Sequence, residues 1–304
     1  MSGTNRLYQN QLIESGTLGF VDVTSAAGVS GINTLPRADG RNNNSDDSLA
    51  AAWFDPDRDG DLDLYVGNHN DLSDNFPFDG ATDTFYLNNG DGTFTEATAL
   101  HNLGGYEERD GDTNNFADTN AVVSGDLNND GWVDLLVTNK SGVFNADQIY
   151  INQGADSNGN WLGYESVTFN GNFENSFARE DDGASLITRS AMGANLGDVD
   201  GDGDLDIYIS DNPESNVSRN LGSSNLFINQ FVETGTLSFL HGQVDTGLSW
   251  GVQMEDFDND GDLEIHSTND IGANSGNAAL LEFVGDNPLR VKTALDEGLS
   301  LIHI

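Results

Sequence analysis

A nine-residue acidic pattern recurs four times along the chain and constrains the fold more than any other feature. It reads DPDRDGDLD from Asp55, DLNNDGWVD from Asp126, DVDGDGDLD from Asp198 and DFDNDGDLE from Asp256, at intervals of 71, 72 and 58 residues. Repetition at such a period indicates an array of similar supersecondary units, each too small to bury its apolar face alone. We therefore expect a repeat architecture.

Each copy of the pattern lies between two runs that are typical of β-strands. A small and apolar run precedes it, and a run of alternating apolar and polar residues follows it, as in LDLYVGN from Leu62. Two further runs complete each unit, TFYLNN and TFTEAT in the first one. Alternation with period two predicts strands, and four antiparallel strands make one propeller blade. The predicted fold is an all-β propeller.

The repeats predict one propeller domain with complete blades over 48–98, 119–169, 191–242 and 249–298. Residues 1–27 match strands three and four of a further blade, because RLYQNQLIESGTLGF from Arg6 is close to NLFINQFVETGTLSF from Asn225. About four and a half blades are thus expected, as a fragment of a seven-bladed ring. The last residues, 299–304 (LSLIHI), are interpreted as a sequencing-adaptor scar, with an ordinary hydrophobic tail as the alternative.

The acidic pattern places oxygen atoms at alternate positions of a tight loop. Ca²⁺ takes six to eight oxygen ligands, and a glycine at position 6 permits the sharp turn. We predict about four Ca²⁺ sites, one in each complete blade, with side-chain ligands at positions 1, 3, 5 and 9 and a backbone carbonyl at position 7. In chain order, the predicted ligands are Asp55, Asp57, Asp59, Asp61 and Asp63; Asp126, Asn128, Asp130, Trp132 and Asp134; Asp198, Asp200, Asp202, Asp204 and Asp206; and Asp256, Asp258, Asp260, Asp262 and Glu264.

An EF-hand and a metal-free turn are the two alternatives to this calcium loop. An EF-hand needs an acidic ligand at position 12, where this chain has Val66, Val137, Ile209 or Ser267. The loops could instead be metal-free hairpin turns, since Asp, Asn and Gly favour turns. Carboxylates about 4 Å apart repel by ~4 kcal/mol at an effective dielectric constant of 20, which favours the metal site. Glu264, in place of Asp, makes the fourth site the weakest match.

With these loops between the first two strands of each blade, the chain resembles the FG-GAP/VCBS repeats of integrin α-subunit heads and bacterial surface proteins. It is also similar to the cartilage acidic protein and ASPIC/UnbV group, through the segments from Phe85 to Thr98 and from Phe20 to Val29. The resemblance implies a calcium-stabilised propeller that serves in adhesion or recognition outside the cell.

The composition excludes several other function classes. The chain has 51 Asp and Glu against 11 Lys and Arg, a net charge of -40, which argues against binding to nucleic acid or to an anionic membrane. It has no Cys, so disulfides and thiolate sites are excluded. This stretch holds no transmembrane run and no signal peptide. No catalytic signature surrounds any histidine, and we expect a protein that is not an enzyme.

A ligand surface is expected on the face opposite the calcium loops, where a meander places the longer connections. Aromatic residues on these connections could stack on a sugar or anchor a protein partner: Phe76, Phe78, Tyr106, Phe116, Phe173 and Phe177. The prediction is an extracellular or cell-surface module that binds a protein or glycan as part of a longer chain. A polysaccharide lyase and a structural spacer are the alternatives, and the sequence leaves open a further cation at Asp110, Asp112, Asn114 and Asp118.

Overall fold

The computed structural model describes residues 5–31, 46–70, 82–101, 103–104, 119–139, 147–166, 191–211, 223–245, 249–269, 279–282 and 290–293. Strands dominate these residues. The helices among them have four residues each: α1 (Leu12–Ser15), α2 (Thr24–Ala27), α3 (Thr98–His101) and α5 (Phe231–Thr234). No described helix is long and apolar enough to cross a membrane.

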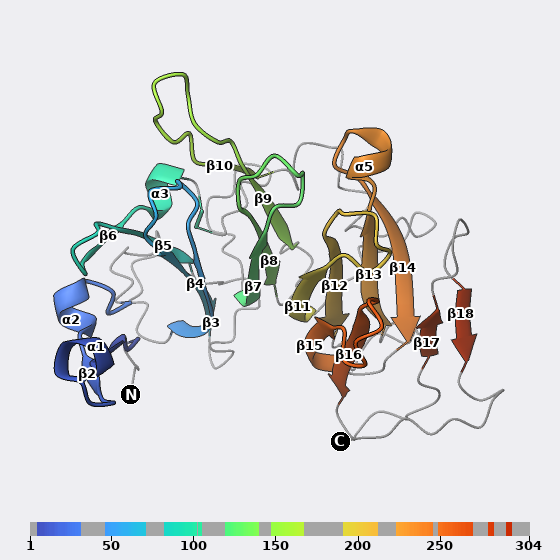
Figure 1. Cartoon of the computed structure of the whole chain (residues 1–304), viewed down its shortest axis with the longest axis horizontal. Coiled ribbons are helices and arrows are strands. Elements are labelled where there is room, and N and C mark those ends of the chain that lie inside the picture. Colours follow the sequence, from blue (N-terminus) through green and yellow to red (C-terminus); the bar gives the residue numbers. More distant parts are fainter. Residues whose placement is uncertain are drawn as a thin grey trace.

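Three four-stranded antiparallel sheets follow one another across the molecule, from cyan to orange in Figure 1. In each sheet the strands pair in chain order, as a meander. This confirms the predicted all-β fold of four-stranded blades. The first blade contains β3 (Asp46–Phe54), β4 (Asp63–Asn70), β5 (Thr84–Asn88) and β6 (Phe94–Glu96); the second contains β7 (Thr119–Gly125), β8 (Asp134–Asn139), β9 (Gln148–Asn152) and β10 (Tyr164–Ser166); the third contains β11 (Ala191–Gly197), β12 (Asp206–Asp211), β13 (Ser223–Asn229) and β14 (Phe239–Asp245).

Ahead of the first blade lies a two-stranded sheet of β1 (Tyr8–Asn10) and β2 (Phe20–Asp22), where the sequence predicts a half blade. Helix α1 fills the turn between these strands, as α5 does between β13 and β14. Both helices end at a left-handed glycine, Gly16 and Gly235, with φ of 68° and 67°. Glycine adopts this conformation without steric strain, so the similarity of the two sequences extends to the turn.

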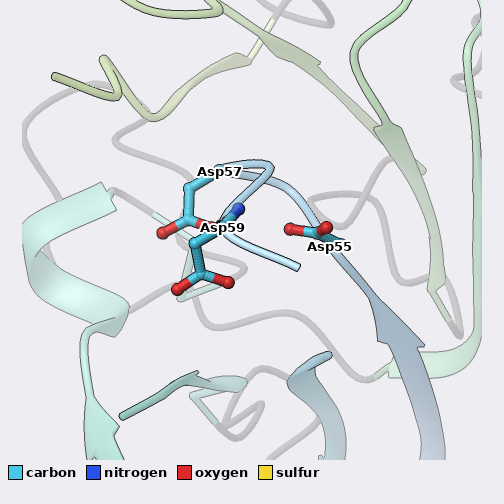
Figure 2. A group of neighbouring side chains, drawn as sticks. All are labelled: Asp55, Asp57 and Asp59. Atoms are coloured by element: carbon cyan, nitrogen blue, oxygen red, sulfur yellow. Dashed lines mark hydrogen bonds between the residues drawn. The ribbon is translucent and has the colours of Figure 1, made fainter. Parts of the chain in front are cut away.

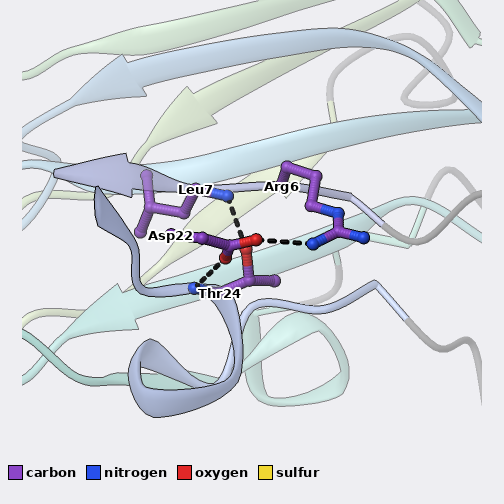
Figure 3. A network of polar contacts seen from close by, with 4 residues as sticks. All are labelled: Arg6, Leu7, Asp22 and Thr24. Carbon is purple, nitrogen blue, oxygen red and sulfur yellow. Dashed lines mark hydrogen bonds and ion pairs between the residues drawn. The ribbon is translucent and has the colours of Figure 1, made fainter. Parts of the chain in front are cut away.

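A small polar network joins the start of the half blade to its second strand (Figure 3). The Leu7 N–H donates to Thr24 Oγ1 at 2.8 Å, and the Thr24 N–H donates to Asp22 Oδ1 at 3.1 Å. The Arg6 guanidinium pairs with the same carboxylate. Because this pair is largely exposed, it contributes little stability, and it orients the chain entering β1.

The fourth repeat is described only in part. The sequence predicts one blade over 249–298, whereas the described strands form two separate pairs, β15 (Ser249–Glu255) with β16 (Glu264–Asn269), and β17 (Ala279–Glu282) with β18 (Arg290–Thr293). No pairing joins β16 to β17 in the described chain. The third run of this repeat, ALLEFV, lacks the Asn that ends the third strand of the other blades, and this Asn binds the acidic loop, as described below.

The hydrophobic core lies between successive sheets. Phe54, Tyr65 and Phe85 of the first blade pack in one cluster with Leu135 and Val137 of the second. Similar clusters join the half blade to the first blade, the second blade to the third, and the third blade to β15 and β16. Burying one such side chain stabilises the fold by ~1.5–3 kcal/mol. Each blade therefore depends on its neighbours for its core, as expected for a repeat array.

Candidate metal centres

The acidic loops follow the first strand of each blade and share one backbone conformation. We number them loop 1 (55–63), loop 2 (126–134), loop 3 (198–206) and loop 4 (256–264). Positions 4 and 6 are left-handed in every loop. The residues at position 4 are Arg58, Asn129, Gly201 and Asn259, with φ of 59°, 52°, 76° and 62°, and those at position 6 are Gly60, Gly131, Gly203 and Gly261, with φ of 95°, 86°, 98° and 104°.

The left-handed residue at position 4 is a feature that the sequence analysis missed. Asn and Gly tolerate this conformation, and their presence in three of the four loops was the available signal. Arg58 gains no such tolerance, and its conformation costs about 1 kcal/mol. Two left-handed residues so close together coil the chain into a loop whose backbone N–H groups point inward.

These N–H groups hold the carboxylates at positions 1 and 5 in the same way in all four loops. The glycine N–H at position 6 donates to the position-1 carboxylate at 3.2, 2.7, 3.1 and 3.1 Å in loops 1 to 4. The N–H at position 7 donates to the position-5 carboxylate at 2.9, 2.8, 2.8 and 3.0 Å. Both acidic side chains are thus oriented by the backbone of their own loop.

Three loops bring carboxylate oxygens from three residues within 4.8 Å of one another. In loop 1 these are Asp55, Asp57 and Asp59, whose side chains gather at one turn in Figure 2. The other groups are Asp198, Asp200 and Asp206 in loop 3, and Asp256, Asp258 and Asp260 in loop 4. Loop 2 has an amide at position 3, and Asn128 Nδ2 donates to Asp130 Oδ2 at 3.0 Å. It is the least acidic of the four loops.

The carboxylate at position 9 lies beneath the loop. Asp63, Asp134 and Asp206 are at most 2% exposed, whereas Glu264 is half-buried. Burial raises the pKa of each of these three aspartates to about 7, and neighbouring loop carboxylates add to the rise. An opposite charge nearby would lower the pKa of a carboxylate. These raised pKa values indicate a site whose negative charge no described side chain compensates.

The oxygens of position 9 have two backbone donors in loops 2 and 3. One oxygen accepts the N–H at position 2, from Leu127 to Asp134 Oδ2 and from Val199 to Asp206 Oδ2, both at 2.8 Å. The other accepts the N–H of the Asn that ends the third strand, also at 2.8 Å. In loop 4 the Phe257 N–H donates to Glu264 Oε2 at 3.1 Å. Position 9 thus fastens its loop to the blade beneath it.

Buried oxygens without a hydrogen-bond partner show that the loops fit a cation. Asp55 Oδ1 and Asp63 Oδ2 in loop 1 and Asp202 Oδ2 in loop 3 are each buried and accept no hydrogen bond. A buried polar atom without a partner is costly, the more so when it is charged. The loops contain no His or Cys, so the side-chain atoms that could bind a metal are all oxygens, which suits a hard cation.

The Asn that ends the third strand is a site residue that the sequence analysis did not find. Asn88, Asn152 and Asn229 each donate a side-chain N–H to the carbonyl at position 8 of their own loop, at 3.0, 3.3 and 3.2 Å. Their Oδ1 atoms accept the N–H two residues later, at 3.0, 3.0 and 3.1 Å. The signal was the shared Asn of TFYLNN, QIYINQ and NLFINQ.

Two of these Asn side chains also bind the loop of the preceding blade. Asn152 Nδ2 donates to the Pro56 carbonyl at 2.8 Å, and Asn229 Nδ2 donates to the Leu127 carbonyl at 2.7 Å. Both carbonyls are at position 2 of an acidic loop. A single Asn therefore contacts its own loop and the neighbouring one, and this arrangement links successive loops mechanically.

Position 4 of one loop also reaches position 7 of the next. The Arg58 guanidinium lies over the Trp132 ring, 4.3 Å from its centre, and Asn129 Nδ2 donates to Asp204 Oδ1 at 2.5 Å. The sequence predicts only a backbone carbonyl ligand at position 7. In the structure, two of the position-7 side chains, Trp132 and Asp204, also contact the preceding loop. Loops 1, 2 and 3 thus form a connected row instead of separate turns.

Other candidate residues of the sequence analysis lie outside the described part of the chain. These are the acidic set at 110–118 and the six aromatic residues of the long connections. His101 is described, and it packs against Trp161 and Phe85 with ring centroids 4.2 and 5.9 Å away. Burial lowers its pKa. Its Nε2 is buried and has no hydrogen-bond partner among the described residues.

Comparison with known proteins identifies the repeats. The profile of a family described as FG-GAP-like repeat matches residues 55–137, 126–209 and 198–267. No curated protein matches the chain. Among solved structures, one titled "Crystal structure of exotype rhamnogalacturonan lyase YesX" aligns with a TM-score of 0.39 and 15% identity, over 75% of this chain. The chain spans only 39% of the length of that structure.

Proposed function

The chain belongs to the FG-GAP-like repeat family, whose matches together span residues 55–267, and on this premise we propose that its four acidic loops bind calcium to stabilise an extracellular recognition propeller. In this proposal the metal is structural. The surface that recognises a ligand is separate from the loops that hold the metal, and the protein is not an enzyme.

The observation that carries the calcium proposal is the set of buried carboxylate oxygens without partners, two in loop 1 and one in loop 3. The acidic loops hold their carboxylates close together. The ion pair found among the described residues joins Arg6 to Asp22, and neither residue belongs to an acidic loop. A bound divalent cation would neutralise these carboxylates. Side chains at positions 1, 3, 5 and 9 and the carbonyl at position 7 would hold it.

The proposed ion is calcium rather than magnesium or zinc. Zinc prefers His and Cys, which the loops lack. Magnesium needs near-ideal octahedral geometry and gives up its water reluctantly, whereas calcium accepts six to eight oxygens in flexible arrangements. A loop with several carboxylates suits the larger ion.

Structural calcium sites of modest affinity imply an environment where calcium is abundant. By mass action, a site with Kd ~0.1 mM in ~2 mM calcium would add about 1.8 kcal/mol to stability. Millimolar free calcium is found outside the cell, and we propose that location.

The recognition surface is proposed on the face opposite the loops. Loops 2 and 3 each lie beside the turn between strands three and four of their own blade. The Val232 N–H donates to Asp204 Oδ2 at 2.6 Å, and a Cβ on Gly154 would lie 3.0 Å from Trp132 Nε1. In an antiparallel blade the remaining connections emerge at the other end. We propose that these longer connections bind a protein or a glycan.

Isothermal titration with calcium, after treatment with chelator and gel filtration, tests the metal proposal. We expect about four ions per chain and a higher thermal midpoint in 2 mM calcium than in chelator. Magnesium at the same concentration is the control. Failure to bind calcium at millimolar concentration would contradict the proposal.

Glycan-array and protein pull-down assays with the calcium-loaded protein test the recognition proposal. Binding should survive substitutions in the loops that leave the protein folded. Release of unsaturated products from uronate polysaccharides, seen as new ultraviolet absorbance, would instead show a lyase.

A further inference from the structure

Loop 1 differs from the other loops at position 2. This position is Pro56 in loop 1, and it is Leu127, Val199 and Phe257 in loops 2, 3 and 4. The backbone N–H of the last three donates to the position-9 carboxylate, at 2.8, 2.8 and 3.1 Å. Proline has no N–H. The corresponding oxygen in loop 1, Asp63 Oδ2, is buried and accepts no hydrogen bond, and the side chain is 2% exposed.

A second oxygen of loop 1 also lacks a partner. Asp55 Oδ1 is buried and accepts no hydrogen bond. The same oxygen at position 1 of loops 2, 3 and 4 accepts the N–H at position 5, each at 3.1 Å. In loop 1 that N–H, from Asp59, donates to position 3 alone, to Asp57 Oδ1 at 3.2 Å, whereas in loops 2 and 3 it donates to positions 1 and 3. Two carboxylate oxygens of this loop are therefore available for a ligand.

The other loops offer fewer such atoms. Among the described residues, loop 3 has one buried oxygen without a partner, Asp202 Oδ2, and loops 2 and 4 have none. The Arg58 guanidinium does not compensate loop 1, because it lies over Trp132 of the neighbouring loop. Loop 1 thus combines three clustered carboxylates with two free and buried oxygens.

We propose that loop 1 is the tightest calcium site of the array and that Pro56 is the residue that makes it so. The inference rests on the proposed calcium function. An oxygen that already accepts an N–H must share or lose that bond when it binds a metal, whereas a free oxygen has no bond to lose. In the calcium-free protein the free oxygens destabilise the loop, and metal binding removes this penalty. By omitting one donor, Pro56 keeps Asp63 Oδ2 for the cation.

The first test identifies the tightest site by titration. Each of three variants replaces the position-3 aspartate by its amide, Asp57→Asn in loop 1, Asp200→Asn in loop 3 and Asp258→Asn in loop 4, so that all three lose the same charge. Calorimetric titration with calcium should show loss of the tightest binding step in the loop 1 variant alone. Persistence of that step in Asp57→Asn would overturn the inference.

The second test restores the missing donor. Pro56→Leu copies loop 2 and supplies an N–H to Asp63 Oδ2. We expect calcium affinity at the tightest site to fall by about tenfold, the effect of one hydrogen bond to a charged group, while the other sites keep theirs. The thermal midpoint in chelator should rise, because a buried oxygen gains a partner. A general loosening of the loop would lower both the calcium affinity and the thermal midpoint in chelator. The inference therefore requires the affinity to fall while the midpoint rises.

Val199→Pro is the reciprocal variant, since it removes the same donor from loop 3, and Val199→Ala is its packing control. The proline variant should raise the calcium affinity of loop 3, whereas the alanine variant should leave it within a factor of two. Equal affinities in the two variants would contradict the role of the N–H. If the unaltered protein bound no calcium, the proposed function itself would fail; if it bound calcium with Asp57→Asn unaffected, only the ranking of loop 1 would fail.

Discussion

Replacing Asn152 by alanine should destabilise two blades at once, since this side chain joins loop 1 to the second blade. Asn152 is 1% exposed. Its Nδ2 donates to the carbonyls of Pro56 and Val133 at 2.8 and 3.3 Å. Its Oδ1 accepts the Gly154 N–H at 3.0 Å and the Trp161 Nε1–H at 2.9 Å. Alanine would remove all four hydrogen bonds.

The size of the effect follows from these contacts. A typical hydrogen bond contributes ~0.5–1.5 kcal/mol net, and a buried partner left unsatisfied costs ~1–3 kcal/mol. Since water can reach some of the abandoned groups once the side chain is removed, we expect a loss of about 3–5 kcal/mol in the free energy of unfolding. The backbone N–H that binds Asp134 remains, so the change isolates the side chain.

Urea unfolding at a fixed 2 mM calcium measures this loss, with an unchanged slope as evidence that the compactness of the unfolded state is the same. Gln153→Ala, at the exposed next residue, is the control and should change stability by less than ~0.5 kcal/mol. Asn152→Ala should also weaken calcium binding at loop 1, although Asn152 belongs to the second blade and loop 1 to the first. A stability equal to that of the control would refute the reasoning.

Three further predictions concern pH, a buried hydroxyl and a loop glycine. Because burial raises the pKa of Asp63, Asp134 and Asp206 to about 7 in the folded protein, above the ordinary value near 4 in the unfolded chain, the calcium-free protein should lose stability as pH rises from about 4 to about 7. Thermal midpoints in chelator at pH 5 and 8 check this, and a higher midpoint at pH 8 would contradict it. Tyr65→Phe removes the hydroxyl that donates to the buried Asp83 Oδ2 at 2.8 Å, and should cost ~1.5–3 kcal/mol in urea unfolding, whereas Tyr8→Phe, at a side chain 55% exposed, should have no measurable effect. Gly131→Ala should lower the thermal midpoint by more than Gly60→Ala. Both positions are left-handed, but only at 131 would the added Cβ lie 2.6 Å from Arg58 Nη2. Equal midpoints in the two variants would exclude a steric contribution from that arginine.

The repeat, the strand pattern and the family can all be predicted from short stretches of the sequence. Alternating apolar residues and acidic turns are properties of short segments, because strand alternation and turn preference act over a few residues. Four copies of one nine-residue pattern were therefore enough to predict antiparallel four-stranded sheets, and three described sheets confirm them. The metal ligands at loop positions 1, 3, 5, 7 and 9 remain a prediction, and the carboxylate clusters of loops 1, 3 and 4 support it.

The contacts that join one loop to the next could not be predicted from the sequence, because they depend on how the blades pack. Asn152 and Pro56 are 96 residues apart, and Asn229 and Leu127 are 102 apart. Their hydrogen bonds exist because the core between successive sheets brings one blade's third strand beside the preceding blade's loop. The alternation of apolar and polar residues within one segment cannot predict such a contact. The same holds for Pro56, which in the sequence is one variable residue among four. Its effect becomes clear from the other loops, where the N–H groups of Leu127 and Val199 bind the position-9 oxygen that has no partner in Asp63.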